Sequence, residues 1–266
     1  MTGRLFRTGG VVVLALALSA CSNDAAPDAS SAPGAAGAAT ATAPASPGAP
    51  AGSEGTSGPE SCGALSLVEG ATIAGSSLGA CMVDYLAFAG SGASSTTSET
   101  TSSRMVWRMA DDYEAYAELD SGMRMTATGG RAWVDFGDGA WVEADPATPG
   151  MEVAFGIVQA WREMSAPELV RRMVASAPVW NVGPARDVAL PDGTSRRLTG
   201  VTAASPFAWS GATVTAMTLW MDEPGRIILQ ETTAGAAGFT ATSRTHATQW
   251  GGEVEIPDPA ASGRAR

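Results

Sequence analysis

Strict alternation of apolar and polar residues is the feature that most constrains how this chain can fold. Every second residue is apolar in three successive segments, residues 104–109, 113–119 and 123–128. A period of two places successive side chains on opposite faces of a strand. Turn residues at 120–122 (Asp-Ser-Gly) and 129–130 (Gly-Gly) separate the segments and predict short connections. The pattern therefore predicts an antiparallel sheet with one buried face and one solvated face.

Further strands are expected along the rest of the chain. The turns Gly137-Asp138-Gly139 and Asp222-Glu223-Pro224-Gly225 each lie between two apolar, strand-like segments, which predicts two more hairpins. The expected strands lie at residues 131–136, 140–144, around 188, 197–201, 212–221, 226–232 and 239–249, before a terminal segment at 253–256.

Helical spacing occurs in two places. Residues 78–88 predict a first helix, and residues 151–177 repeat apolar side chains every three to four positions. Within the second region, Ser165 and Glu168 predict a capping box that begins a new helix. The Ser/Thr-rich stretch 91–103 is interpreted as a loop. Strands, then helices, then strands predict an α+β fold with a mostly antiparallel sheet.

Composition excludes several kinds of chemistry. The 266 residues carry 16 basic and 27 acidic side chains, a net charge of −11, and every basic residue is arginine. Without lysine there is no Schiff-base lysine and no phosphate-binding P-loop lysine. His246 is the single histidine, which excludes a multi-histidine metal site. The acidic balance argues against nucleic-acid binding. We therefore predict no cofactor, no metal and no catalytic residue.

The N-terminus has the features of an export signal. Arg4 and Arg7 precede a short apolar run at 11–18, which ends in Leu18-Ser-Ala-Cys21. The run is too short to span a bilayer, which needs about 20 apolar residues. The last four residues look like a bacterial lipobox, in which Cys21 becomes the acylated N-terminus. The chain would then be anchored to the outer face of the cell membrane. The alternative is a signal peptide with an incidental cysteine.

A low-complexity segment follows. Of the forty residues 22–61, all but five are Ala, Gly, Pro, Ser or Thr, too few apolar groups to offset the entropy of ordering. Such a tether averages roughly 35 Å end to end. The predicted organisation is a signal peptide (1–20), a lipidated N-terminus and tether (21–61), one folded domain (62–258) and a disordered tail (259–266).

Cys62 and Cys81 are the other cysteines, and in an exported protein they predict a disulfide. Closing so short a loop stabilises the fold by about 3 kcal/mol in the chain-entropy model. The bond would hold the first helix against the start of the domain. Two buried free thiols are the alternative.

The strand at 212–221 is apolar on both faces. Val214, Ala216 and Trp220 are expected on one face, and Met217, Leu219 and Met221 on the other. Such a strand must be covered on both sides. Helices would cover one side, and more protein or a ligand the other; methionine is frequent at adaptable apolar surfaces. The alternative is that these side chains only fill a core.

The order of these segments resembles a known family, the actinobacterial envelope lipoproteins of the LppX/LprG type, within the wider LolA-like half-barrel carriers. The resemblance covers about residues 80–258. It depends on patterns at 131–141 (Arg-Ala-Trp-Val-Asp-Phe-Gly-Asp-Gly-Ala-Trp), 218–226 (Thr-Leu-Trp-Met-Asp-Glu-Pro-Gly-Arg) and 250–257 (Trp-Gly-Gly-Glu-Val-Glu-Ile-Pro). It implies a curved antiparallel sheet wrapped around a few helices, an apolar cavity for acyl chains and no catalytic residues. The strand at 239–249 is more polar than a lipid-lined wall should be.

We therefore expect a membrane-anchored protein that binds a lipid or another apolar ligand. A module that binds or senses an envelope protein on the same fold is the alternative. The candidate cavity residues are Trp107, Met109, Trp133, Phe155, Trp161, Val214, Met217, Leu219 and Trp220.

Two motifs point weakly to other chemistry. Residues 75–79 match the G-x-S-x-G pattern of a hydrolase nucleophile, which would require His246 close to Ser77. His246 is instead interpreted as an exposed strand residue. Asp111-Asp112 and Asp135 to Asp138 are interpreted as turn residues, since their spacing does not match an EF-hand calcium loop.

Overall fold

A computed structural model describes residues 58–110, 113–145, 147, 155–156, 158–159, 161, 166–236 and 238–261. Its helices within those residues are α2 (Glu60–Gly63), α3 (Gly75–Ala89) and α5 (Pro167–Ser176). The predicted leader, Cys21 and nearly all of the tether lie outside the described residues. None of the helices described is long and apolar enough to cross a bilayer. The strands are β1 (Thr72–Ala74), β2 (Ser91–Ser98), β3 (Ser102–Met109), β4 (Tyr113–Leu119), β5 (Arg124–Thr128), β6 (Arg131–Asp135), β7 (Val142–Glu143), β8 (Val179–Ala189), β9 (Ser195–Ala203), β10 (Phe207–Trp209), β11 (Ala212–Glu223), β12 (Arg226–Ala236) and β13 (Phe239–Trp250).

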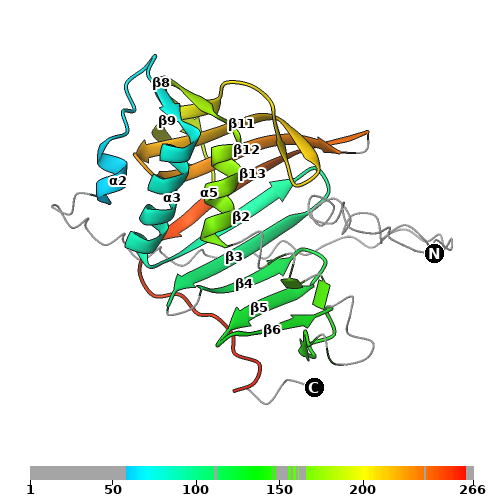
Figure 1. Ribbon diagram of the computed structural model, residues 1–266. Helices are drawn as coiled ribbons and strands as arrows, with labels where there is room; N and C mark the ends of the chain where they lie inside the picture. Colours follow the sequence, from blue (N-terminus) through cyan, green and yellow to red (C-terminus); the bar gives the residue numbers. More distant parts are fainter. Residues whose placement is uncertain are drawn as a thin grey trace, which may run out of the picture.

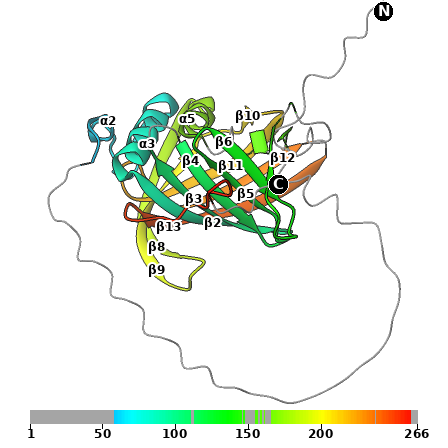
Figure 2. The same ribbon diagram turned by 90° about the horizontal axis from the view of Figure 1, so that it is seen from below.

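The strands form one open antiparallel sheet. Its order is β1-β8-β9-β11-β12-β13-β2-β3-β4-β5-β6-β7, with β10 paired to β11. The sheet curves around α3 and α5, which lie on its concave face (Figures 1 and 2). The predicted α+β class and curved, mostly antiparallel sheet are confirmed. So are the first helix and the predicted hairpins, to within a few residues.

The interpretation of residues 91–103 as a loop is wrong. This stretch contains β2, which joins the two halves of the sheet by pairing with β13 and β3. Its first four residues are buried. Hydrogen bonds satisfy its hydroxyls: Ser91 Oγ donates to Gly252 O at 2.6 Å, and Thr96 Oγ1 lies 3.0 Å from Thr245 Oγ1. Small polar residues conceal this strand from a pattern of apolar alternation.

A β-bulge changes the predicted faces of β11. The register with β12 shifts between Val214 and Ala216, so Thr215 is an extra residue on its strand. Val214 therefore joins Met217, Leu219 and Met221 in the core under the helices, where the sequence had placed it with Trp220. Ala216 is exposed. Trp220 faces the convex side and packs with Leu198, Ile228 and other apolar residues.

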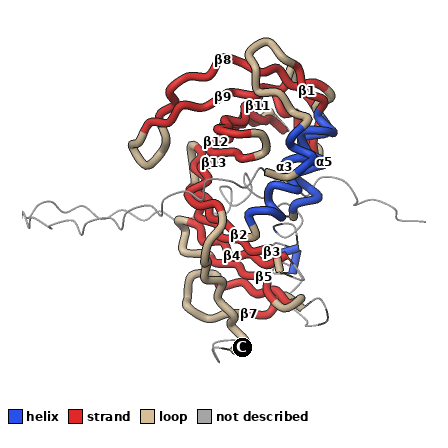
Figure 3. The backbone as a smooth tube through the Cα atoms, turned by 90° about the vertical axis from the view of Figure 1, so that its left-hand side faces the viewer, coloured by secondary structure: helices blue, strands red, loops and turns tan. Residues whose placement is uncertain are grey.

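Protein also covers the convex side of β11 around Trp220. The β8–β9 hairpin bends away from the helices and lies over this side of the sheet (Figures 2 and 3). The Arg186 guanidinium stacks 4.5 Å from the centre of the Trp220 ring. Arg244 donates to Ala189 O at 3.3 Å, which ties β13 to the hairpin. The prediction that both faces are covered is confirmed at Trp220, where the bent hairpin supplies the second layer, but not at Ala216, which is exposed.

One smaller prediction also needs correction. Helix α5 takes Ala166 as its N-cap with no side-chain cap, and Glu168 pairs with Arg171, so the Ser165–Glu168 capping box is wrong. Ser165 itself lies outside the described residues. Residues 253–256 have no regular secondary structure. In the mostly undescribed stretch before α5, Val158 and Trp161 are buried against β3 to β6.

Candidate functional site

A small apolar pocket lies between the helices and the concave face of the sheet. Its volume is about 140 Å³, and its lining exposes mostly apolar atoms. Side chains from α3, α5 and the central strands surround it. They are Met82, Leu86, Ala93, Ser94, Trp107, Val170, Gly225, Ile227, Gln230, Thr245, Ala247, Gln249 and Trp250.

Two aromatic rings, those of Trp107 and Trp250, form one wall, and Tyr85 packs against Trp250. The Trp250 ring meets Tyr85 edge-on at 5.3 Å and Trp107 at 5.9 Å between centroids. The indole nitrogen of Trp250 donates to Ile227 O at 3.0 Å, which fixes the ring against β12. Gly92 makes room for this wall, because a Cβ there would lie 2.6 Å from the Trp107 ring. Such edge-on contacts are favourable beyond the area they bury.

The other end of the pocket is polar. Gln230 Nε2 donates to Thr232 Oγ1 at 3.1 Å, and Thr245 Oγ1 lies 3.0 Å from Thr96 Oγ1. These groups lie on the concave face of β2, β12 and β13. One side of the pocket is therefore aromatic, and the other side carries hydroxyl and amide groups. This polar side agrees with the Thr-rich sequence of residues 239–249.

A disulfide lies beside Gly225, one of the residues that line the pocket. Cys62 and Cys81 are bonded, which confirms the predicted pair and joins α2 to α3. The β11–β12 turn packs directly on the sulfur atoms. A Cβ at Gly225 would lie 2.7 Å from Cys81 Sγ and 2.9 Å from Cys62 Sγ, and its φ of +85° also favours glycine.

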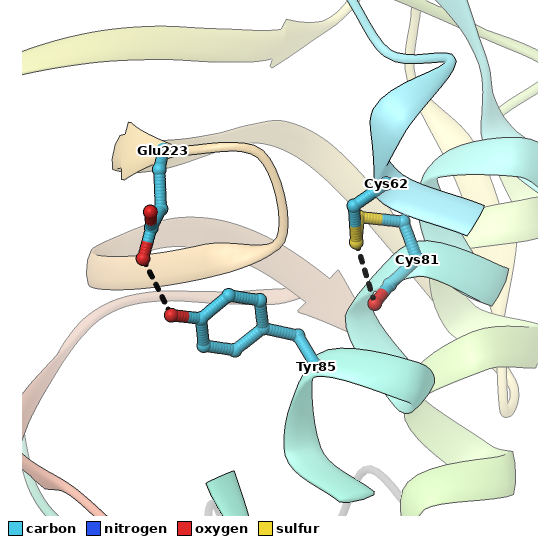
Figure 4. Close-up of a disulfide and its surroundings, with 4 residues drawn as sticks. All are labelled: Cys62, Cys81, Tyr85 and Glu223. Carbon is cyan, nitrogen blue, oxygen red and sulfur yellow. Dashed lines mark hydrogen bonds between the residues drawn. A yellow bond between two sulfur atoms is a disulfide. The ribbon is translucent and has the colours of Figure 1, made fainter. Parts of the chain in front are cut away.

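Tyr85 connects the same turn to α3, as Figure 4 shows. Its hydroxyl donates to Glu223 Oε1, and burial followed by this hydrogen bond raises the pKa of Tyr85 well above its ordinary value. Arg226 pairs with Asp222 at 2.7 Å and with Glu223 at 3.2 Å. The hydrogen bond to Asp222 raises the pKa of Arg226 above the already high value of an ordinary arginine, so the guanidinium stays charged. The network orients the turn; none of its groups points to a chemical reaction.

The predicted cavity residues fall into three groups. Trp107 lines the pocket, and Met109 and Trp161 pack in the adjoining apolar cluster, while Phe155 is half-buried. A second group belongs to the core beneath α3 and α5: Val214, Met217 and Leu219. Trp133 and Trp220 face the convex side. Trp133 pairs with Thr126, whose hydroxyl donates to Pro257 O in the C-terminal segment that crosses that side.

Several lining residues were missed from the sequence. Trp250 could have been found, since it begins the 250–257 pattern on which the family resemblance depends. Met82 and Leu86 lie on the first predicted helix. The apolar spacing of a helix predicts which positions are buried, but not which of them border a cavity. Ile227 follows the predicted turn at 222–225, and its position depends on the irregular register between β11 and β12.

Known proteins share little with this chain in sequence. No family model matches the chain, and no curated protein matches it. A solved DUF1329 family protein from Desulfovibrio piger aligns with 71% of this chain and 97% of its own, at 9% identity and a TM-score of 0.28. The curved sheet around helices still agrees with the fold that the LppX/LprG resemblance implies.

The G-x-S-x-G stretch has a packing explanation. Gly75 and Gly79 lie one turn apart on α3, where α5 approaches closely: a Cβ would lie 1.9 Å from Ala177 O and 2.7 Å from Arg171 O. Ser77 is exposed on α3. His246 is 4% exposed, so its interpretation as a surface residue is wrong. It pairs with Leu229 on the convex side, so the structure does not bring it to Ser77.

No group of three or more potential metal ligands occurs in the part of the chain that the structure describes. Asp135 accepts hydrogen bonds from the amides of Gly137 and Gly139, and Asp138 accepts one from that of Ala140. Both act as turn residues, as predicted. Asp111 and Asp112 lie outside the described residues. The pocket's lining is mostly apolar.

Proposed function

We propose that this protein is an exported lipoprotein, acylated on Cys21, that binds a lipid or another apolar ligand between α3, α5 and the concave sheet. The observation that carries the binding proposal is the pocket of about 140 Å³ lined by Trp107 and Trp250, whose rings meet edge-on. The lipobox-like Leu18-Ser-Ala-Cys21 and the tether support the anchoring. Membership of the LppX/LprG type of envelope lipoproteins is part of the same proposal.

Apolar burial would supply the binding free energy, at about 25 cal/mol per Å². The pocket has a volume of about 140 Å³. The smallest typical binding sites for small molecules have volumes of about 300 Å³, roughly twice as large. The pocket accommodates part of an acyl chain. A longer chain would require α3 and α5 to move away from the sheet, so we expect ligand binding to change the packing of Met82 and Leu86.

Metabolic labelling tests the anchoring. The full chain should incorporate labelled palmitate in a bacterial host that modifies lipoproteins, and Cys21→Ser should abolish incorporation. Retention of the label in Cys21→Ser would contradict acylation at this cysteine.

Ligand binding is tested with cis-parinaric acid, a fluorescent fatty acid, on the full chain carrying Cys21→Ser. Ala247→Phe puts a ring into the pocket and should weaken binding about tenfold or more. Ala216→Phe is the matched control, since Ala216 is exposed on the convex side, and it should bind as the parent does. Equal binding by both variants would contradict the proposed site. Native mass spectrometry with lipid extraction would then identify any bound lipid.

The small size of the pocket favours a second candidate, a module that binds an envelope protein. That function needs no ligand cavity. Absence of parinarate binding, together with an unliganded mass, would favour it.

A further inference from the structure

Two hairpins of the sheet carry no charge at their tips, although the protein is strongly acidic and the neighbouring β2–β3 turn carries Glu99. Residues 198–221 and 232–243 contain no Asp, Glu, Arg or His, in a chain of net charge −11. The structure brings these two stretches together, since β11 pairs with β10 and with β12, and β12 pairs with β13. We call this region, formed by the β10–β11 and β12–β13 hairpins, the uncharged end.

The β12–β13 hairpin projects from the rest of the sheet. Pairing of β13 with β2 begins at Ser243 and Ser98, so residues 239–242 extend beyond the neighbouring strand. The hairpin reaches past the end of β2 in Figure 1. Phe239, which pairs with Ala236 beside the turn, is 71% exposed. Among the described residues it is the most exposed of the large hydrophobic side chains.

A second aromatic side chain lies along the same edge. Trp209 pairs with Ala212, and because Thr213 pairs with Gly235, Ala212 and Ala236 are the next residues in that register. Directly paired residues share a face of the sheet. Trp209 and Phe239 therefore belong to one row on the concave side, about three strand spacings or ~14 Å apart. Trp209 is half-buried against the core and Phe239 is free of it.

We propose that the uncharged end, with Phe239 at its tip, is a contact surface for a lipid bilayer of low surface charge. This inference depends on the proposed membrane anchoring. A tether of forty residues, averaging roughly 35 Å, lets the domain turn this end toward the membrane. The uncharged end enters the interface without desolvating a charged group, whereas the acidic remainder is repelled by anionic head groups. Aromatic side chains, tryptophan among them, are enriched at the interface between membrane and water.

The β6–β7 turn provides a matched control. Phe136 is 50% exposed, but Asp135 and Asp138 flank it closely in sequence. Asp135 is buried, but Asp138 is exposed two residues from Phe136, so this tip should not enter a membrane interface, because the Asp138 carboxylate would have to lose water. Phe136→Asp and Phe239→Asp therefore make the same chemical change at an acidic and an uncharged tip.

Flotation with phosphatidylcholine vesicles tests the proposal on the full chain carrying Cys21→Ser. We expect Phe239→Asp to weaken vesicle binding about tenfold, since an interfacial phenylalanine is lost and a charge is added. Phe136→Asp should bind as the parent does. Vesicles containing phosphatidylglycerol should bind less parent protein at low salt, because both surfaces are negative.

Equal binding by Phe239→Asp and the parent, or no binding of the parent to neutral vesicles, would overturn the bilayer surface. Neither result affects palmitate incorporation at Cys21 or parinarate binding. Conversely, loss of palmitate labelling with intact flotation would overturn the anchoring alone. Phe239→Asp should keep the parent's melting temperature, because Phe239 packs against no core cluster of the described residues.

Discussion

The hydroxyl of Tyr85 on α3 donates a 2.5 Å hydrogen bond to the carboxylate of Glu223 in the β11–β12 turn. This bond holds the helix to the sheet next to the disulfide. Tyr85 is 5% exposed. Burial, the hydrogen bond and the charge of Glu223 raise the pKa of its hydroxyl, against an opposing effect of Arg226.

The raised pKa predicts a loss of stability at high pH. Unfolded Tyr85 loses its proton near pH 10, whereas the folded side chain keeps it. The contribution of Tyr85 is therefore complete below about pH 10 and decreases above it. Since the chain has no lysine and arginine stays protonated, its tyrosines dominate this pH range. Urea unfolding between pH 8 and about 11.5 should show the decrease.

Tyr85→Phe should cost about 1 kcal/mol at pH 8, from the lost hydrogen bond, and should flatten the alkaline decrease. Tyr116 acts in the same direction, because burial and Glu118 raise its pKa too. Adding Tyr116→Phe should therefore flatten the curve further. A Tyr85→Phe variant that loses stability as steeply as the parent would contradict the assignment.

The disulfide should make stability depend on redox conditions. Removal of the Cys62–Cys81 bond by Cys62→Ala/Cys81→Ala should cost about 3 kcal/mol, which is roughly 6–12 °C in melting temperature for a domain of this size. Dithiothreitol should lower the melting temperature of the parent and leave the double variant unchanged. A reductant effect of equal size in both proteins would point to another cause.

The packing of α3 on α5 predicts the reverse of the usual helix rule. Gly→Ala inside a helix normally stabilises by up to about 1 kcal/mol. At Gly79 a Cβ would lie 2.7 Å from Arg171 O, so Gly79→Ala should destabilise by about 1–3 kcal/mol. In α2, Gly63 has nothing within 4 Å of such a Cβ, so Gly63→Ala should be neutral or stabilising. Urea midpoints compare the two; stabilisation by both would show that α5 can shift.

Alternation predicted the sheet where side chains differ in polarity, and failed where they do not. Strand β4 alternates clearly because one face packs on a core and the other is more exposed, whereas β5 and β6 also bury Thr126, Trp133 and Asp135 on their outer face. In β2, serine and threonine occupy both faces, since Trp107 and Trp250 cover it from neighbouring strands. A strand buried by its neighbours' side chains needs few apolar residues of its own.

The site was harder to predict than the fold. Two of its lining residues, Ile227 and Trp250, lie next to register shifts, between Met221 and Glu223 on β11 and between Ala247 and Gln249 on β13, that sequence periodicity does not encode. The bulge at Thr215 likewise moves Val214 onto the concave face. Trp220 appeared suited to a cavity because it is apolar on a doubly covered strand. On the convex side, Trp220 is covered by Arg186 and the bent β8–β9 hairpin. The bulge in this hairpin, between Val182 and Ala185, could not be predicted from the sequence either.

The buried carboxylate of Asp135 predicts sensitivity to acid. Burial alone would raise its pKa, but hydrogen bonds from Arg124 and from the amides of Gly137 and Gly139 outweigh burial and lower it. Folded Asp135 therefore stays ionised at a pH where the unfolded residue is protonated. Its contribution is complete above about pH 4 and is lost as the pH falls through the lowered value.

Asp135→Asn should accordingly cost about 2–3 kcal/mol at pH 7, because it removes the charge that Arg124 and the two amides bind. The difference from the parent should shrink between pH 4 and 2, as the parent's own carboxylate becomes protonated. Asp138→Asn in the same turn is the control. Asp138 is exposed and accepts one amide hydrogen bond, so its replacement should cost less than about 1 kcal/mol at either pH. A deficit in Asp135→Asn that stays constant down to pH 2 would mean that lost packing, not lost charge, causes it.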